Sequence, residues 1–477
     1  MFQLPSQIPL HFTPSRGKFI DLHSPNDNGL ITKVQNATAE DIELIVNATK
    51  SIQKEMKKLP PYERSEILKK AAAHLRNKQE FLAKVIASEG GKPLKDAKVE
   101  VTRAIGTIEL CAEETTRLHG EVIPMERTPS GKDHLSFTVR DPIGAVLAIS
   151  AFNHPLNLIA HQVGCAIASG CSVVLKPASS TPVSAHFLKE AFTSAGLQDK
   201  YLRVVNTEIP QVEKLVASKE FAFVSFIGSA KVGWEMRKKI APGTRLALEH
   251  GGQAPAIIRE DADIDKAVSA LVKGAFYHAG QVCISTQGIF VAEKIFEAFL
   301  AKFKDATEKL VTGSAMNEDT DVGPLIRPGE VERLQKWIEE AKNKGAKIIL
   351  GNKVSGDKKQ YLSPTILTHV PRECSIIKDE AFGPVVCINP YQDEVELLDY
   401  LNDKEYVFEA ALFTRDLSVA IKIATEFSAM TFVINNHTAF RVDQMPFGGH
   451  GLAGLGMGGV KYAMEELTRM KQIIIKI

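Results

Sequence analysis

The sequence predicts an α/β protein of two or three domains built around parallel sheets. Short apolar, β-rich runs alternate with amphipathic stretches over residues 146–249, and a similar alternation returns over residues 264–388. Continuous apolar strands between helices are typical of parallel sheets that are covered on both faces. The 477 residues also exceed the roughly 250–300 residues at which a single core stops growing.

The N-terminal part is predicted to be a helical scaffold. From residue 38 to about residue 118, apolar side chains such as Ile67 and Leu68 lie on one helical face and charged residues lie elsewhere. The pattern breaks at GGKP, residues 90–93, and residues 120–140 are polar and rich in turn formers. We expect this part to support the sheets that follow it.

The two sheets are predicted from the order of strands and helices. In the first part we expect strands at residues 146–150, 172–176, 202–206, 223–228 and 245–249, with helices at 184–195 and 231–240. In the second part, from about Gly251 to Gly449, we expect helices at 264–277 and 293–310 and strands at 288–291, 346–350 and 385–388. The terminal run from Ile473 to Ile475, between lysines, predicts an edge strand. That strand either pairs with another subunit or returns to its own sheet.

Composition excludes several classes of protein. A formal net charge of +1, with 44% hydrophobic and 24% charged residues, provides no field that would attract nucleic acid or an anionic membrane. No segment offers about 18 uninterrupted apolar residues, and MFQLPSQIPLHF lacks the pattern of a secretion signal. The six cysteines have no CxxC spacing and no paired histidines. We therefore predict a cytoplasmic protein with reduced thiols and no metal.

Two residues stand in patterns of covalent catalysis. Cys283, in GQVCIS, follows a glycine-containing turn after an amphipathic helix, which would present its sulfur at a loop. A thiolate there attacks carbonyl carbon, although a small buried cysteine fits the same local pattern. Glu249, in LEHGG, ends an apolar strand, where α/β folds place their ligands. Partial burial would make it a general base, whereas a solvent-exposed strand end would leave it without a role.

Two further segments indicate an oxyanion site and a phosphate site. Asn153, in FNHP, follows a strand, and its amide is a neutral donor for a developing oxyanion. Asparagine is also common in such turns for local reasons. Gly228 and Ser229, in FIGSAKVG, join a strand to a helix whose N-terminus would favour a pyrophosphate. The segment does not match GxGxxG, the ordinary dinucleotide fingerprint.

The order of these segments resembles the aldehyde dehydrogenase superfamily over essentially the whole chain. The matching segments are FNHP, LKPASSTP, FIGSAKVG, LEHGG, GQVCIS, EAFGPV and MPFGG. Glu249 precedes Cys283 by 34 residues and Glu380 follows it by 97, as the family pattern expects. The resemblance implies the aldehyde dehydrogenase-like fold, with a Rossmann-type cofactor domain (1–123 and 143–250), a catalytic α/β domain (251–450) and a small β oligomerisation element (124–142 and 451–477). It also implies a homodimer or homotetramer.

The resemblance assigns a role to each catalytic residue. Cys283 would attack the aldehyde to give a thiohemiacetal, whose oxyanion is held by the Asn153 side chain and the Cys283 N–H. Hydride would then pass to the nicotinamide and leave a thioester, and Glu249 would activate the water that hydrolyses it. The implied ligands are a small aldehyde and NAD or NADP.

The resemblance also assigns the cofactor contacts. They are the adenosine ribose at Lys176, the pyrophosphate at Gly228 and Ser229, and the nicotinamide ribose and ring at Glu380 and Phe382. Ser179 departs from many NAD-preferring members, which have a glutamate three residues after the lysine. Because a carboxylate there repels a 2′-phosphate, its absence predicts that NADP is tolerated or preferred.

The substrate side resembles members that act on small polar or anionic aldehydes, such as lactaldehyde, succinic semialdehyde or phosphonoacetaldehyde dehydrogenases. The segments FNHPLN and FRVDQMP carry this resemblance. His154, Arg103 and Arg441 are candidates for a cation cluster that would hold an anionic group. Alternatively, Arg441 pairs with Asp443 and only braces its loop.

Two alternative functions compete with this prediction. A CoA-acylating semialdehyde dehydrogenase is the other enzyme, but such members generally lack the general-base glutamate that Glu249 provides. A catalytically silent relative is the non-enzymatic alternative, and such proteins usually lose the cysteine. Here Cys283, Glu249, Asn153 and Glu380 are all present, so the sequence favours an active enzyme whose thioester reacts with water.

Overall fold

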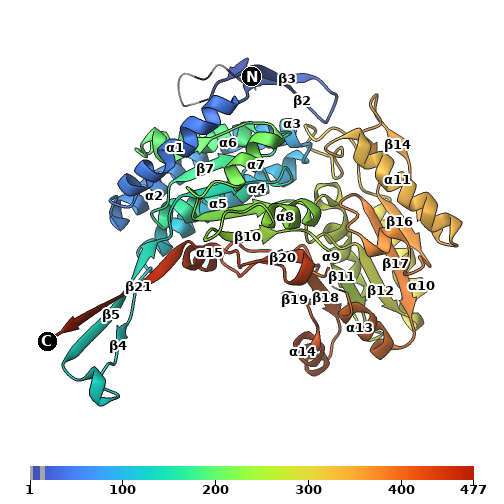
Figure 1. The fold of residues 1–477 in the computed structure, drawn as a ribbon. Helices are drawn as coiled ribbons and strands as arrows, with labels where there is room; N and C mark the ends of the chain where they lie inside the picture. The colour runs from blue at the N-terminus through green and yellow to red at the C-terminus, as the bar shows by residue number, and fades with distance from the viewer. Residues whose placement is uncertain (1–3, 11–14, 16, 405) are drawn as a thin grey trace.

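The structure, a computed structural model, describes residues 4–10, 15, 17–404 and 406–477 (Figure 1). Part of the N-terminal segment MFQLPSQIPLHF lies outside the described residues. Among the described helices, none is long and apolar enough to cross a membrane. The chain forms two large sheets with helices around them, and a small sheet that projects from the body (Figure 1).

The first large sheet has six strands in the order β20-β10-β9-β6-β7-β8. Its parallel strands are β6 (Val146–Ile149), β7 (Val173–Lys176), β8 (Leu202–Val204), β9 (Phe223–Ile227) and β10 (Arg245–Glu249). The five strands predicted from the sequence are confirmed. Most of their apolar side chains are buried, as expected for strands of a covered parallel sheet. The helices between them are α5 (Asn157–Ala168), α6 (Val183–Ser194), α7 (Ile209–Val216) and α8 (Ala230–Arg237).

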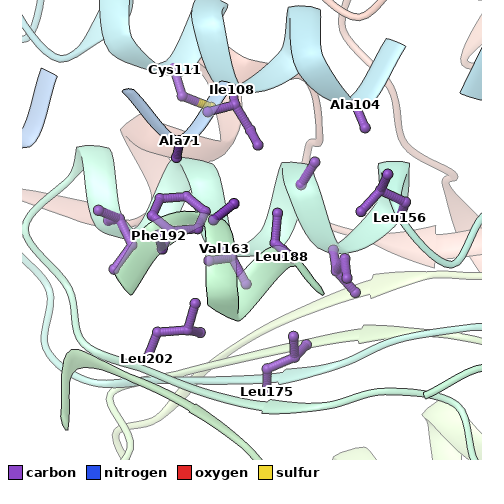
Figure 2. Packing of buried hydrophobic residues seen from close by; sticks show 14 of the residues in the cluster. Ala71, Ala104, Ile108, Cys111, Leu156, Val163, Leu175, Leu188, Phe192 and Leu202 are labelled. Atoms are coloured by element: carbon purple, nitrogen blue, oxygen red, sulfur yellow. The ribbon is translucent and has the colours of Figure 1, made fainter. Parts of the chain in front are cut away.

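Four helices form the scaffold that was expected before the first sheet. They are α1 (Ala39–Met56), α2 (Pro61–Asn77), α3 (Gln79–Gly90) and α4 (Leu94–Glu114). α3 ends at Gly90, and the next residue, Gly91, caps it with a φ of 67°, a left-handed conformation that glycine adopts without strain. Figure 2 shows Ile108 of α4 above Val163 of α5 and Phe192 of α6. The scaffold therefore packs on the helices that cover the sheet.

The second large sheet has seven strands in the order β13-β16-β17-β12-β11-β18-β19. They are β11 (Pro255–Ile258), β12 (Gly288–Ala292), β13 (Lys347–Leu350), β16 (Thr365–Thr368), β17 (Val385–Tyr391), β18 (Glu409–Phe413) and β19 (Thr431–Ile434). β13 is antiparallel to its neighbour, and the other described pairings are parallel. The helices are α9 (Ile264–Phe276), α10 (Phe296–Thr307), α11 (Pro328–Asn343), α12 (Ser375–Lys378), α13 (Glu394–Asn402) and α14 (Leu417–Glu426). The sequence analysis predicts β12, β13 and β17 but not β11, β16, β18 and β19. PAII begins with proline and EAALF is rich in alanine, which explains the misses at β11 and β18.

The terminal strand returns to its own chain. β21 (Thr468–Lys476) pairs antiparallel with β5 (His134–Pro142), which pairs with β4 (Val122–Ile123) in the projecting sheet (Figure 1). β21 is an edge strand of this sheet, and Ile474 and Ile475 expose 54% and 45% of their surface. Of the two fates expected, the strand pairs within its own chain, and its outer edge has no neighbouring strand among the described residues.

The segment before the terminal strand belongs with the first sheet. β20 (Gly454–Leu455) pairs antiparallel with β10, and α15 (Val460–Glu466) packs on α4 and α5. The boundary expected at residue 451 therefore differs from the observed packing, because Val460 and Met464 are buried in the same core as those helices. The other described strands are β1 (Gln7–Ile8), β2 (Phe19–His23), β3 (Leu30–Gln35), β14 (Val354–Ser355) and β15 (Tyr361–Leu362).

Candidate active site

A cavity of about 1080 Å³ lies along the carboxyl ends of β6, β7, β9 and β10 and reaches the turn after α9. Open α/β sheets bind their ligands at these strand ends. The structure brings all twelve predicted site residues to the cavity wall: Arg103, Asn153, His154, Lys176, Ser179, Gly228, Ser229, Glu249, Cys283, Glu380, Phe382 and Arg441. Segments far apart in the sequence thus meet around one space.

Cys283 is presented by a strained turn after α9. His278 and Ala279 have φ angles of 48° and 53°, and Gly280 follows with 67°. Gly280 is required there, since a Cβ atom would lie 2.1 Å from the Gly383 carbonyl oxygen. Cys283 is partly exposed, whereas the other five cysteines are buried. The structure therefore distinguishes Cys283 from the thiols of the core.

The environment of Cys283 keeps its thiol protonated at rest. Burial raises its pKa above the ordinary value, and the carboxylates of Glu380, Glu409 and Glu249, when ionised, act in the same direction. The positive charge of Arg441 opposes them. Because the thiolate is the nucleophile, a base must remove this proton before the sulfur attacks a carbonyl carbon.

Glu249 ends β10 and faces the same cavity. Burial raises the pKa of its carboxyl, while the charges of Arg441 and His161 lower it. Gly458 leaves room for the carboxylate, since a Cβ atom there would lie 2.7 Å from Glu249 Oε1. Glu249 thus has the enclosed environment that suits a general base, and not that of a strand end in bulk solvent.

Asn153 and His154 form a buried turn between β6 and α5. The His154 ring centroid lies 6.1 Å from that of Tyr277. Burial, followed by the positive charges of Lys92 and Arg103, holds the pKa of His154 well below its usual range. His154 is therefore a neutral imidazole near neutral pH and adds no positive charge to the cation cluster predicted for it.

Arg103 already has a strong acidic partner. It donates two hydrogen bonds to the Asp443 carboxylate, from Nε at 3.1 Å and from a terminal nitrogen at 2.8 Å. His161 Nε2 lies 2.9 Å from the same carboxylate. Although burial alone would raise the pKa of Asp443, these contacts hold it well below its usual range. The charge of Arg103 is therefore compensated within the protein.

The Arg441 guanidinium has no hydrogen-bonded acid among the described residues. Its ion pair with Asp443 is 3.9 Å long and includes no hydrogen bond, because Arg103 occupies that carboxylate. Its Nε is buried without a hydrogen-bond partner, and its guanidinium carbon lies 3.5 Å from the Phe447 ring centroid. The loop-bracing contact considered from the sequence is thus weak, and the guanidinium is available to a ligand.

Another part of the cavity has the features of a dinucleotide site. Lys176 ends β7 and donates a hydrogen bond to Ser179 Oγ at 3.2 Å, and burial lowers the pKa of its ammonium group. Ser229 is the N-cap residue of α8, and its side chain makes no capping hydrogen bond. The N–H groups that open α8 are therefore not satisfied by that side chain and suit an anion.

Glu380 and Phe382 add the groups that a ribose and a nicotinamide ring require. The Glu380 carboxyl is buried, its Oε1 has no hydrogen-bond partner among the described residues, and burial raises its pKa to about 8. A Cβ atom at Gly251 would lie 1.6 Å from this oxygen, so the carboxyl lies directly against the backbone. The Phe382 ring meets Phe152 edge to face at 5.8 Å. Glu380 and Phe382 both line the cavity, so a carboxylate and an aromatic ring stand where a ribose and a nicotinamide ring would bind, and the residues present fit NAD(P).

Two residues of this region are not indicated by the sequence analysis. Glu409, at the start of β18, is fully buried, and both its carboxyl oxygens lack a hydrogen-bond partner among the described residues. Burial raises its pKa to about 8. No local signal marks it, since EAALF resembles any buried strand. Tyr277 lines the cavity beside His154. The sequence could have indicated it, because it stands only six residues before Cys283.

Comparisons with known sequences agree with this geometry. The model of the Aldehyde dehydrogenase family matches residues 12–473. The 3-sulfolactaldehyde dehydrogenase of Priestia aryabhattai is 41% identical over 446 residues, which cover 93% of this chain and 92% of that protein.

Two solved structures are similar along nearly the whole chain. Aldehyde dehydrogenase 21 from Physcomitrella patens, in complex with the reaction product succinate, has a TM-score of 0.95 at 33% identity, with 99% of each chain covered. Glyceraldehyde-3-phosphate dehydrogenase from Methanocaldococcus jannaschii, complexed with NADP, has a TM-score of 0.92 at 38% identity, with 97% of this chain and 100% of that chain covered. As the resemblance predicted, the chain belongs to the aldehyde dehydrogenase family and is an NAD(P)-dependent enzyme that oxidises aldehydes.

Proposed function

We propose that this enzyme oxidises a small aldehyde that carries an anionic group, and that Arg441 binds this group. The observation that carries the proposal is the buried Arg441 guanidinium in the cavity wall, whose Nε has no hydrogen-bond partner among the described residues. The guanidinium also has no hydrogen-bonded acid among the described residues, so a carboxylate, sulfonate or phosphate in the cavity would supply the counter-ion that it lacks. The names of the similar proteins support this choice, since they refer to sulfolactaldehyde, succinate and glyceraldehyde 3-phosphate.

The proposed reaction uses three residues of the cavity wall. The Cys283 thiol gives its proton to water in the cavity, and the thiolate adds to the aldehyde carbon. The oxyanion accepts hydrogen bonds from the Asn153 amide and the Cys283 N–H. NAD(P), when bound, supplies the acceptor for the hydride, and Cys283 then carries a thioester. Glu249 removes a proton from water, whose oxygen adds to the thioester carbon. The C–S bond breaks, the carboxylic acid leaves, and the proton on Glu249 passes to the Cys283 sulfur, which restores the thiol and the carboxylate.

The cofactor would be held by groups of the chain that lie at strand ends and at a helix N-terminus. We propose NADP as the preferred cofactor, because Lys176 and Ser179 provide a cation and a hydroxyl where a carboxylate would repel its 2′-phosphate. The other proposed contacts are the pyrophosphate at Gly228 and Ser229, the nicotinamide ribose at Glu380 and the nicotinamide ring near Phe382.

Replacement of Ser179 by glutamate should shift the enzyme from NADP toward NAD. We expect kcat/KM for NADP to fall about 10- to 100-fold, or about 1.4–2.8 kcal/mol, because the new carboxylate repels the 2′-phosphate. The value for NAD should stay close to that of the wild type. Steady-state kinetics with both cofactors measures the shift, and Ser179→Gln, of the same size without the charge, is the control. A wild-type enzyme restricted to NAD would contradict the proposal.

Replacement of Arg441 by methionine should weaken the binding of anionic aldehydes. We expect their KM to rise about 10- to 100-fold, because a hydrogen bond to a charged group contributes about 1.5–3 kcal/mol. The KM for propionaldehyde, which has no anionic group, is the control and should change little. Since Arg441 also lowers the pKa of Glu249, aldehydes are compared within one variant at one pH.

A substrate panel tests the same proposal on the wild-type enzyme. Lactaldehyde, succinic semialdehyde, phosphonoacetaldehyde and glyceraldehyde 3-phosphate cover a hydroxyl, a carboxylate, a phosphonate and a phosphate. We expect at least one of the three anionic aldehydes to have a higher kcat/KM than lactaldehyde. If lactaldehyde, or a long apolar aldehyde added to the panel, is a better substrate than all three anionic aldehydes, the assignment of Arg441 as the anion receptor is wrong.

We further propose a homodimer or homotetramer whose projecting sheet packs on a partner subunit. Ile474 and Ile475 are exposed on β21, whose outer edge lacks a neighbouring strand among the described residues. Ile474→Lys should lower the molar mass found by light scattering, and a wild-type monomer at all concentrations would contradict the proposal.

We also propose a cytoplasmic location for the enzyme. The sulfurs of Cys111 and Cys165 lie 3.7 Å apart without a disulfide, which suits a reducing compartment. Cell fractionation that finds the protein outside the cytoplasm would contradict this.

A further inference from the structure

A buried charged segment outside the cavity wall connects α3 to α4. Residues 89–100, which we name the strap, comprise the end of α3, the GGKP turn and the start of α4. Glu89, Lys92 and Glu100 expose none of their surface, and none of them lines the cavity. Because buried charges are costly unless they are compensated, their partners show what the strap holds in place.

Glu100 caps the helix that follows Asn153. Its Oε1 accepts hydrogen bonds from the N–H groups of Leu156, at 2.9 Å, and Asn157, at 3.1 Å, and its Oε2 accepts one from Lys92 Nζ. These two N–H groups open α5, which has no side-chain cap from its own N-cap residue. Asn153 lies three residues before Leu156, in the turn that leads into α5. The Glu100 carboxylate therefore fixes the position of the turn that carries the Asn153 amide.

Glu89 has the equivalent role at the helix that follows the proposed cofactor loop. Its Oε2 accepts a hydrogen bond from the Val183 N–H at 2.8 Å, and its Oε1 accepts from the Ser184 N–H at 3.0 Å and from the Ser184 hydroxyl. These groups open α6, whose N-cap residue also provides no side-chain cap. Lys176 ends β7, and Ser179 stands in the connection between β7 and α6. The Glu89 carboxylate therefore anchors the end of that connection.

Asp96 reaches the turn that presents Cys283. Its Oδ2 accepts a hydrogen bond from the His278 N–H at 3.3 Å. His278 has a φ of 48°, so the bond satisfies a backbone donor within the strained turn. Carboxylates of the strap thus accept hydrogen bonds from backbone N–H groups of three turns. These turns adjoin the proposed oxyanion donor, the proposed cofactor lysine and the nucleophile.

We propose that the strap is a positioning element of the reaction, in which Glu100, paired with Lys92, positions Asn153, and Glu89 positions the loop of Lys176. This inference rests on the oxyanion and cofactor roles proposed above. Neither glutamate lines the cavity, so each acts through the turn that its carboxylate caps. Substitution of Glu100 should therefore affect the chemical step, and substitution of Glu89 should affect cofactor binding.

The variants Glu100→Gln and Glu89→Gln form a matched pair, because each keeps a carbonyl oxygen at a buried position and removes one charge. We expect E100Q to lower kcat about 10- to 100-fold with little change in the KM for NADP. We expect E89Q to raise the KM for NADP about 10-fold with little change in kcat. Thermal unfolding shows whether each variant folds. If one does not, Glu100→Asp and Ser184→Ala perturb the same contacts more gently and carry the same expectations.

A double-mutant cycle separates positioning from a general loss of stability. In an Asn153→Ala background, E100Q should lower kcat by less than about two-fold, because the group that it positions has been removed. E89Q should still raise the KM for NADP in that background. The inference would be overturned if the fold-losses of kcat caused by E100Q and by N153A multiplied in the double variant. It would also be overturned if E100Q and E89Q changed kcat and the KM for NADP to the same extent. A normal kcat for N153A alone would instead disprove the proposed oxyanion role, and the strap proposal for Glu100 with it.

Discussion

Replacement of Cys283 by alanine is expected to abolish aldehyde oxidation, with a loss of at least about 10⁴-fold in kcat/KM. The proposed reaction needs a sulfur to form the thiohemiacetal and the thioester, and alanine provides no nucleophile. The other five cysteines are buried, so none of them can replace Cys283 at the cavity. NADP should still bind with nearly the wild-type Kd, because the residues proposed to hold it are unchanged.

Formation of NADPH in the steady state measures this effect. The matched control is Cys374→Ala, which removes a buried thiol at the N-cap of α12 and should leave the rate nearly unchanged. Iodoacetamide should modify Cys283 faster than the other five thiols, and aldehyde should slow the modification. A Cys283→Ala enzyme that oxidised aldehyde at the normal rate would refute the assignment of the nucleophile.

The second large effect is expected for Glu249→Gln, which should slow the release of the acid. Glutamine keeps the size of the side chain but cannot remove a proton from water, so kcat should fall about 10²- to 10⁴-fold. A rapid burst of NADPH, equal to the concentration of active sites, should precede the slow phase in a stopped-flow experiment, because thioester formation comes before hydrolysis.

Two outcomes would contradict the role proposed for Glu249. If Glu249→Gln gave no burst and its steady-state rate equalled that of the wild type, the carboxylate would not act on the thioester. A wild-type enzyme whose turnover depends on CoA would show that a thiol, and not water, releases the acyl group. Asp379→Asn is the matched control, because it removes the carboxylate adjacent to Glu380 without changing a residue of the cavity wall.

The same two groups give the pH dependence a defined sign. Burial raises the pKa of the Glu249 carboxyl and of the Cys283 thiol. Because the carboxylate and the thiolate are the reactive forms, activity should rise between about pH 6 and pH 9 and fall as either group takes up its proton. A wild-type rate that decreased across this range would be the opposite result.

Much of the site could be predicted because its residues stand at the ends of recognisable strands. β6, β9 and β10 are apolar runs between helices, and Asn153, Gly228 and Glu249 follow or end them. The carboxyl ends of parallel strands meet at one edge of a sheet, so these residues must lie close together whatever conformation the loops adopt. Cys283 and Glu380 are on loops, and the resemblance to the family, not the strand pattern, predicted their place.

The partners of the charged residues could not be predicted in this way. Local sequence offers Asp443 to Arg441, two residues away, yet the carboxylate is held by Arg103, which is 340 residues away. The same applies to His154, whose neutrality depends on burial and on Lys92 and Arg103. No periodic pattern relates residues from such distant segments.

The amino-acid pattern was sufficient for the α/β class and the parallel strands of the first sheet, and its ordered motifs were sufficient for the family and for twelve residues of the cavity wall, because these depend on local periodicity and on motifs of fixed order. Only the packed chain decided that Arg441 keeps an unpaired donor, that residues 454–466 pack with the first sheet and its helices, and that Glu89 and Glu100 are buried caps. Charge state, hydrogen-bond partners and burial arise from contacts between distant segments, and these contacts exist only after the chain has folded.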